Sequence, residues 1–165
     1  MNKLFFKIFL IFTLFFSFAN AKVENEIYFL PNKAKAAKEK IIDYIKDSKK
    51  NIYVSMYNFS YKKFAKPLGK ASKRGVKVTV YLDKSKVKKD DSIYKYLIKK
   101  GVKVVVADKK LHTKIAIFDE KTIVLGSTNW TKDSFSGNYE VILFSNDKEI
   151  ISKSLKFLNK LGKAN

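Results

Sequence analysis

The 165-residue sequence contains no cysteine and a single histidine, His112. The absence of cysteine excludes a disulfide framework, a thiolate zinc site and a cysteine nucleophile. One histidine, with no cluster of carboxylates larger than an adjacent pair such as Asp90-Asp91, leaves no metal-ligand set of the usual spacing. The sequence therefore predicts neither a bound metal nor another cofactor.

Arginine is almost absent as well, since 34 of the 35 basic residues are lysine and only Arg74 is arginine. Acidic residues number 15, which gives a formal net charge of +20. An AT-rich genome would raise the lysine content, but it would not suppress Asp and Glu, so the excess indicates an anionic partner: nucleic acid, an acidic membrane surface or another polyanion. Lysine is suited to phosphate contacts, whereas bidentate recognition of guanine usually uses arginine. If the partner is nucleic acid, we expect binding that is independent of sequence and steeply salt-dependent.

The first 21 residues have the pattern of a secretory signal peptide. Lys3 and Lys7 precede an apolar run over residues 8–18, and Ala19-Asn20-Ala21 fits a small-x-small cleavage site. The run is too short for a comfortable membrane span, although an uncleaved anchor that associates the protein with the membrane is the alternative. Cleavage would remove two lysines and no acids, which leaves +18 on residues 22–165. We therefore expect a periplasmic or secreted protein.

The remaining chain alternates helical and strand patterns and then changes to strands with a closing helix. The expected helices cover 33–49, 61–74, 90–100 and 147–161, and the expected strands cover 27–30, 51–58, 76–83, 102–107, 112–118, 122–126 and 138–145. Residues 119–121 join two of the strands as a hairpin. There is no internal repeat and no linker rich in Pro, Gly or Ser. The pattern predicts one α/β domain in which helices sandwich a mixed β-sheet.

Three pairs of polar residues lie on or just after consecutive predicted strands. The pairs are His112 with Lys114, Ser127 with Asn129, and Asn138 with Glu140. Residues two apart on a strand face the same way, so the three pairs are expected to converge on one cleft. Asp119 follows His112 by seven positions, an odd separation that points its carboxylate away from that cleft.

Six positions in this stretch fit the pattern H-x-K-x4-D-x6-G-S-x-N without a gap: His112, Lys114, Asp119, Gly126, Ser127 and Asn129. The motif and the strand that follows it resemble the phospholipase D superfamily. In length and element order, residues 22–165 resemble the small secreted bacterial endonucleases of that superfamily. The resemblance implies the superfamily's αβα sandwich and a phosphodiesterase with a histidine nucleophile.

The mechanism that the resemblance implies needs two histidines. His112 would attack phosphorus to form a phosphohistidine, and a second histidine would protonate the leaving oxygen and later activate water. This chain has only one histidine. We therefore expect an obligate homodimer with the active site on its two-fold axis, where the two copies of His112 act as a coupled pair.

The resemblance also implies roles for the other motif residues. Lys114, Asn129 and Ser127 would bind the non-bridging phosphate oxygens and stabilise the transition state. Glu140, in the position of the family's downstream acid, would accept a hydrogen bond from a histidine ring. Asp119 completes the catalytic set on the strength of the motif alone.

Several of these residues have a purely structural interpretation beside the functional one. Trp130 and Asn138 complete the candidate substrate-binding set. A tryptophan after the motif either stacks on a base or packs in the core, which is the commoner case, and Asn138 also suits the start of a strand. Ser127 also suits a turn, and Glu140 also suits an ion pair with a surface lysine, although we favour the functional interpretation of both. The alternating face at 53–57 either lines the cleft or packs within the sheet, and we favour sheet packing.

The motif does not decide the substrate, because phospholipases, phospholipid synthases and nucleases share it. The charge of the chain favours a metal-independent, non-specific endonuclease that acts on DNA, with activity on RNA and a preference for single strands left open. A phospholipase D-type hydrolase that docks its basic surface on anionic lipid is one alternative. A nucleic-acid binding or uptake protein is the other.

Overall fold

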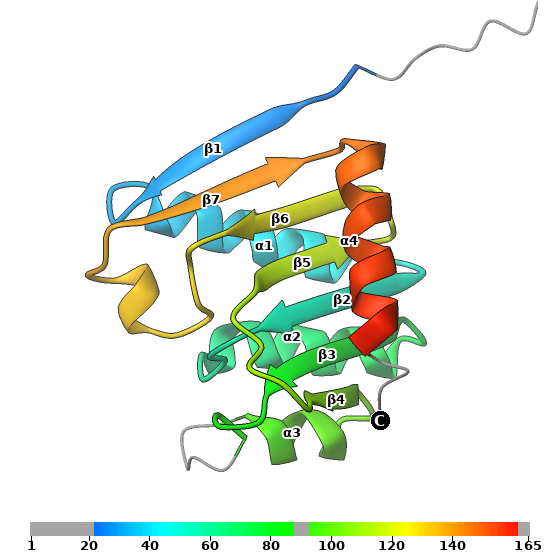
Figure 1. Cartoon of the computed structure of the whole chain (residues 1–165). Helices are drawn as coiled ribbons and strands as arrows, with labels where there is room; N and C mark the ends of the chain where they lie inside the picture. Colours follow the sequence, from blue (N-terminus) through cyan, green and yellow to red (C-terminus); the bar gives the residue numbers. More distant parts are fainter. Residues whose placement is uncertain (1–21, 88–92, 162–165) are drawn as a thin grey trace, which may run out of the picture.

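A seven-stranded mixed sheet forms the centre of the protein (Figure 1), which is described here by a computed structural model over residues 22–87 and 93–161. The strands lie in the order β1-β7-β6-β5-β2-β3-β4. Their bounds are β1 Asn25–Leu30, β2 Asn51–Met56, β3 Lys77–Asp83, β4 Lys103–Ala107, β5 Lys114–Phe118, β6 Thr122–Gly126 and β7 Glu140–Ser145. The helices are α1 Ala34–Asp47, α2 Lys62–Lys73, α3 Tyr94–Lys99 and α4 Lys148–Leu161, with a short 3-10 turn, η1, at Asp133–Phe135.

The two halves of the sheet follow from how their strands are connected. β2, β3 and β4 are parallel, and α2 and α3 provide the crossovers that parallel neighbours require. β5, β6, β7 and β1 pair antiparallel, and β5 also pairs antiparallel with β2. The β5–β6 hairpin turns at Asp119 and Glu120, whose φ values of 51° and 56° suit the two central positions of a type I′ turn.

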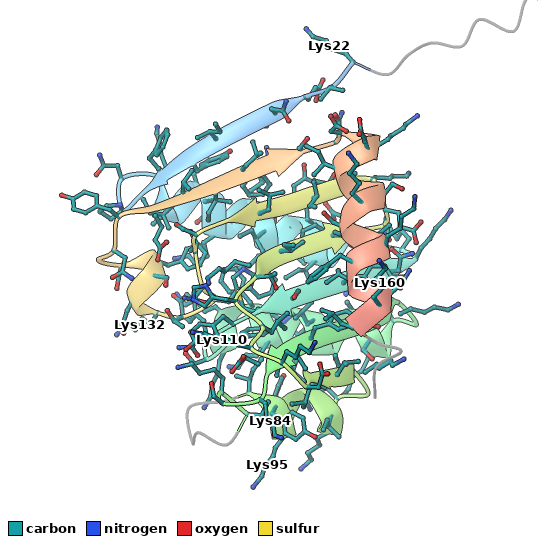
Figure 2. All side chains as sticks on the ribbon, in the orientation of Figure 1. Lys22, Lys84, Lys95, Lys110, Lys132 and Lys160 are labelled. Carbon is teal, nitrogen blue, oxygen red and sulfur yellow. The ribbon has the colours of Figure 1, made fainter. Side chains whose placement is uncertain are left out.

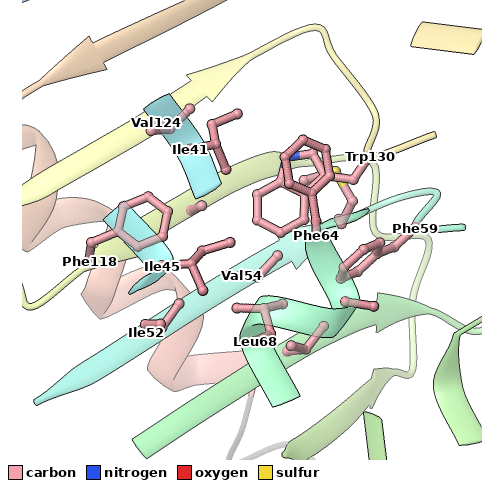
Figure 3. Close-up of a cluster of buried hydrophobic side chains, with 14 of the residues drawn as sticks. Ile41, Ile45, Ile52, Val54, Phe59, Phe64, Leu68, Phe118, Val124 and Trp130 are labelled. Carbon is pink, nitrogen blue, oxygen red and sulfur yellow. The ribbon is translucent and has the colours of Figure 1, made fainter. Parts of the chain in front are cut away.

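Helices cover both faces of the sheet, which confirms the predicted αβα sandwich. α1, α2 and α3 lie on one face and α4 on the other (Figure 1). On α1 the buried side chains of Ala37, Ile41 and Ile45 recur every four residues and pack against β2, β5 and β6 (Figure 3). The core beneath α4 is smaller and centres on Ile117, Ile123 and Leu158.

Two predicted strands are shorter at the end where the site forms. β5 begins at Lys114 and β7 at Glu140, so His112 and Asn138 lie in the loops that precede them. α3 begins at Tyr94 rather than Asp90, which lies outside the described residues. The predicted signal segment, 1–21, is also outside them. Within residues 22–87 and 93–161, no helix has both the length and the apolar character that a bilayer span needs.

Candidate active site

The polar residues of the motif meet at one edge of the sheet because of strand direction. β2, β3 and β6 end at this edge, whereas β5 and β7, which run the opposite way, begin there. The loop before β5, the loop after β6 and the first residue of β7 therefore lie together at this edge. These segments carry His112, Lys114, Ser127, Asn129 and Glu140.

His112 and Lys114 both lie against one aromatic ring, that of Tyr57. The exposed imidazole of His112 contacts this ring edge-on, with the ring centroids 4.6 Å apart. The Nζ of Lys114 lies 5.3 Å from the Tyr57 centroid and donates a hydrogen bond of 3.0 Å to the His112 carbonyl. Burial lowers the pKa of Lys114, while the charge of Glu140 acts in the opposite direction. The ammonium group is thus held next to the nucleophile that the motif predicts.

Glu140 is fixed by Ser127 and Asn138. Ser127 Oγ donates to Glu140 Oε2 in a short hydrogen bond and accepts one of 3.1 Å from the Val141 N–H. Asn138 Nδ2 donates to Glu140 Oε1 at 3.4 Å. The resemblance predicts a bond between Glu140 and a histidine ring. Within the described part of one chain, Ser127 and Asn138 are the side chains bonded to Glu140, and His112 is not.

Gly126 explains why the motif needs a glycine before Ser127. A Cβ at this position would come within 2.0 Å of the Val141 carbonyl oxygen on β7. The same carbonyl accepts the N–H of Ser127 at 3.1 Å. Only a residue without a side chain allows β6 and β7 to approach this closely, and that approach brings Ser127 to Glu140.

Asn129 is positioned by the loop that follows β2. Its Oδ1 accepts the N–H of Asn58 at 3.1 Å, while the Asn58 carbonyl accepts the N–H of Trp130 at 3.1 Å. Because the amide oxygen is held, the Nδ2 group points to the opposite side of the amide, where it can donate to a substrate oxygen. This loop pairing brings Asn129 to the same edge as His112 and Lys114.

The structure removes Trp130 from the candidate substrate-binding set and places it in the core, the structural alternative. Its side chain is 2% exposed and packs between Phe59 and Phe64, with ring centroids 5.0 Å and 4.6 Å away (Figure 3). A ring buried in the core cannot reach a nucleotide. Trp130 instead anchors the segment that carries Asn129.

The structure also corrects the place of Asp119 in the catalytic set. Asp119 follows the far end of β5, roughly 16 Å of strand from Lys114. Its carboxylate accepts the backbone N–H groups of Lys49 and Lys50, at 2.8 Å each, and of Asn51 at 3.0 Å. Burial acts to raise the pKa of Asp119, but these three donors outweigh it and lower the pKa. The odd separation from His112 predicted this orientation, and the motif match alone did not.

Two residues of the edge were not predicted to belong to the site. Tyr57, assigned to sheet packing, contacts both His112 and Lys114. Asp83, at the end of β3, is 3% exposed and accepts the N–H of Leu111, the residue before His112, at 2.8 Å. The alternating pattern at 53–57 was a usable signal for Tyr57. No sequence pattern pointed to Asp83, because an aspartate at the end of a strand is not in itself a sign of a functional site. Across residues 22–87 and 93–161, no group of three His, Cys, Asp or Glu side chains is placed to hold a metal ion.

The α/β sandwich and an edge that brings together a histidine, a lysine and an asparagine define the class: a phosphodiesterase-type site on a phospholipase D fold. The family model described as "Cardiolipin synthase, PLD-like domain" matches residues 41–161. The chain therefore belongs to this family, within the phospholipase D superfamily.

Curated relatives of the chain include enzymes named for lipid chemistry. The chain is 29% identical to "Phospholipase D" of Rickettsia prowazekii over 118 residues, which are 70% of this chain and 58% of the relative. It is 30% identical to "Mitochondrial cardiolipin hydrolase" of Canis lupus familiaris over 104 residues, 61% of this chain and 41% of the relative. The chain thus spans less than three fifths of the length of these relatives.

Two solved structures share the fold over almost their full length. NucT from Helicobacter pylori superimposes with a TM-score of 0.80 at 28% identity, over 85% of this chain and 96% of NucT. Nuc from Salmonella typhimurium, a phospholipase D family member, superimposes with a TM-score of 0.77 at 23% identity, over 85% of this chain and 94% of Nuc. The αβα sandwich expected from the sequence is thus the fold of these structures.

Proposed function

We propose that the protein is a metal-independent endonuclease that hydrolyses phosphodiester bonds of nucleic acid through a phosphohistidine. The observation that carries the proposal is the meeting of His112 and Lys114, at the start of β5, with Asn129, from the loop after β6, at one sheet edge of a strongly cationic protein. Histidine and lysine supply the nucleophile and the positive charge that this chemistry needs. Activity is therefore expected to persist in the presence of a chelator.

The reaction proceeds in two displacements. A ring nitrogen of His112 attacks phosphorus, the bond from phosphorus to the leaving oxygen breaks, and a second imidazolium gives its proton to that oxygen. Water then loses a proton to this imidazole and attacks phosphorus, so the P–N bond breaks and His112 is released. Lys114 Nζ and Asn129 Nδ2 donate to the non-bridging oxygens and stabilise their charge in both transition states.

The second imidazole has to come from another copy of the chain, because His112 is the only histidine. We propose a homodimer whose two His112 side chains share one centre. Exposed apolar side chains beside the site support this assembly. Ile27 and Phe29 on β1 are 57% and 65% exposed, and Tyr139, next to Glu140, is 94% exposed. A second copy seated here would cover these side chains and bring its own His112 toward the same edge.

Nucleic acid is the substrate that the charge and the size of the chain favour. The net charge of +20 rests almost entirely on lysine. The likeness to NucT covers nearly all of that small protein, whereas the phospholipase D relatives are much longer than the matched region. Export through the segment 1–21 would place the enzyme in the periplasm or outside the cell, and N-terminal sequencing of the mature protein tests this.

A phospholipase is the second candidate, and the exposed Phe29 and Tyr139 favour it. Apolar side chains beside the site would insert into a bilayer whose anionic lipids attract the lysines. The relatives named phospholipase D and cardiolipin hydrolase are consistent with this activity.

One experiment separates the two candidates. Purified protein is incubated in EDTA with labelled single- and double-stranded DNA, RNA, and vesicles that contain cardiolipin or phosphatidylglycerol. We expect nucleic-acid fragments, suppressed by rising salt, and no phosphatidic acid. His112→Ala should abolish turnover while nucleic-acid binding stays near that of the parent. Release of phosphatidic acid without DNA or RNA cleavage would establish the phospholipase instead, and nucleic-acid binding without turnover of any substrate would establish a nucleic-acid-binding or uptake protein.

The dimer has its own quantitative test. After co-refolding with an equal amount of His112→Ala chains, only about a quarter of the dimers carry two histidines, so activity should fall to about a quarter of that of pure parent dimers at the same total concentration. A self-sufficient monomer would retain about half.

A further inference from the structure

A groove of about 490 Å³ lies at the same sheet edge as the motif residues. Tyr57 separates the groove from His112 and Lys114. Its walls are the turns that follow β3 and β4, and its volume lies within the range of about 300–1,000 Å³ that is typical of ligand sites. The lining residues are Tyr57, Asp83, Lys84, Ser85, Asp108, Lys109 and Lys110. Figure 2 shows Lys84 and Lys110 near one another at this end of the sheet, well separated from Lys160 on α4. None of the lysines of the groove belongs to the motif.

The groove is held together by the buried carboxylate of Asp83. One oxygen accepts the N–H of Ser85 at 2.9 Å and also its hydroxyl, and the other accepts the N–H of Leu111 at 2.8 Å. These bonds join the turn after β3 to the segment that leads into His112. Both carboxylate oxygens of Asp83 are therefore occupied by internal hydrogen bonds. The same bonds hold the groove next to the segment that carries His112.

The exposed charge of the groove is mainly positive. Lys84, Lys109 and Lys110 are exposed, and none of them belongs to the ion pairs of the described residues. The negative charge of Asp108 offsets part of this positive charge, but one of its carboxylate oxygens accepts the N–H of Lys109 at 2.9 Å. Lys86 adds a further cation, with its Nζ 4.7 Å from the Tyr57 centroid. Three exposed ammonium groups around a concave surface are suited to phosphate oxygens.

We infer that this groove binds the backbone phosphates next to the scissile one on a nucleic-acid strand, with Tyr57 as the wall shared with the catalytic centre. The inference rests on the proposed function and deepens it, since it assigns the preference for a polymer to specific residues. Phosphatidylglycerol or a small aryl diester has its single phosphodiester at His112 and no further phosphate to place in the groove. A polynucleotide carries further phosphates that reach Lys84, Lys109 and Lys110.

The test is a triple substitution, Lys84→Ala, Lys109→Ala and Lys110→Ala, in the full chain. Binding of a single-stranded oligonucleotide is measured as a function of salt with His112→Ala added to prevent cleavage. Loss of three phosphate contacts should make the slope of log Kd against log salt shallower by about 2, because each contact contributes roughly 0.7 for a single strand. With His112 intact, kcat/KM for the oligonucleotide should fall at least tenfold more than kcat/KM for bis(4-nitrophenyl) phosphate.

A matched control removes the same charge elsewhere. Lys148, Lys156 and Lys160 are exposed on α4, and their replacement by alanine should leave the salt slope and both kcat/KM values unchanged. Equal effects of the two triple variants would overturn the inference, because the whole-molecule charge would then suffice. An unchanged salt slope in the groove variant would overturn it as well. Failure of the proposed function looks different, since the parent protein would then cleave no nucleic acid at all.

A substitution of opposite sign completes the test. Asp108→Asn removes the carboxylate charge from the groove, so oligonucleotide affinity should rise a few-fold at low salt. If affinity falls instead, Asp108 supports binding and the assignment of the groove to phosphates is wrong.

Discussion

Replacement of Asp119 by asparagine tests whether this motif residue is structural or catalytic. The carboxylate accepts three backbone N–H groups, those of Lys49, Lys50 and Asn51, at 2.8–3.0 Å where β2 begins. Asparagine tolerates the left-handed conformation at φ 51° and keeps one acceptor oxygen, but its NH2 group faces at least one N–H donor.

The size of the effect follows from these bonds. Hydrogen bonds to a charged group contribute about 1.5–3 kcal/mol each, but the N–H groups of Lys49 and Lys50 are exposed, so water replaces part of what is lost. We expect Asp119→Asn to lower the free energy of unfolding by about 2 kcal/mol, and Asp119→Ala by about 3 kcal/mol because alanine also disfavours the left-handed conformation. For a domain of this size, a loss of 2 kcal/mol lowers Tm by roughly 4–8 °C.

The stability difference also has a defined pH dependence. The pKa of Asp119 is lowered in the folded protein, since the three donors outweigh the opposite effect of burial. Its contribution is therefore complete at neutral pH and is lost as the pH falls below the ordinary value of about 3.9 and through the lowered pKa. Urea unfolding at a series of pH values should show the parent and Asp119→Asn converging under acid conditions.

Activity decides between the two roles of Asp119. Well below its Tm, Asp119→Asn should keep kcat within about twofold of the parent, because the residue lies roughly 16 Å along the strand from Lys114. A fall in kcat of more than about a hundredfold with stability intact, a loss of about 2.7 kcal/mol of transition-state stabilisation, would refute the structural assignment.

Three further predictions concern the site edge. Gly126→Ala would place a Cβ 2.0 Å from the Val141 carbonyl oxygen, so β6 and β7 must separate, and urea titration should show a loss of about 3 kcal/mol together with loss of activity. Trp130→Leu should lower stability by about 3 kcal/mol but change oligonucleotide affinity less than threefold, since the ring is buried; a tenfold loss of affinity in the folded variant would restore the stacking role. Burial lowers the pKa of Lys114, so kcat/KM should decline at a pH below the ordinary lysine value of about 10.4, and a decline only above that value would contradict a role for its ammonium group.

Local patterns in the sequence were sufficient for the elements and for most of the motif. The four-residue recurrence of Ala37, Ile41 and Ile45 predicted the buried face of α1, because a helix repeats every 3.6 residues. His112 lies in the loop before β5, so the strand period does not account for its approach to Lys114. The odd spacing of Asp119 did predict that its carboxylate points away from the site, and the structure places that carboxylate at the start of β2. Such inferences succeed because strand and helix periods are local properties of the backbone.

Contacts between segments distant in the sequence were beyond the reach of these patterns. A tryptophan after the motif suits the core more often than a base, but only the contacts of Trp130 with Phe59 and Phe64 show that it packs in the core. The place of Tyr57 depends on the pairing of β2 with β5, which brings residues 57 and 112 together.

The sequence by itself determined the chemistry of this protein: one histidine in a gapless phospholipase D motif, within a chain whose positive charge is almost all lysine. The tertiary structure alone decided how that chemistry is arranged. Because β5, β6 and β7 pair antiparallel, the starts of β5 and β7 and the end of β6 lie at one edge of the sheet. The buried carboxylate of Asp83 connects that edge to a lysine-lined groove. The reason is that residue type and spacing are written along the chain, whereas convergence depends on which strands become neighbours in the folded sheet.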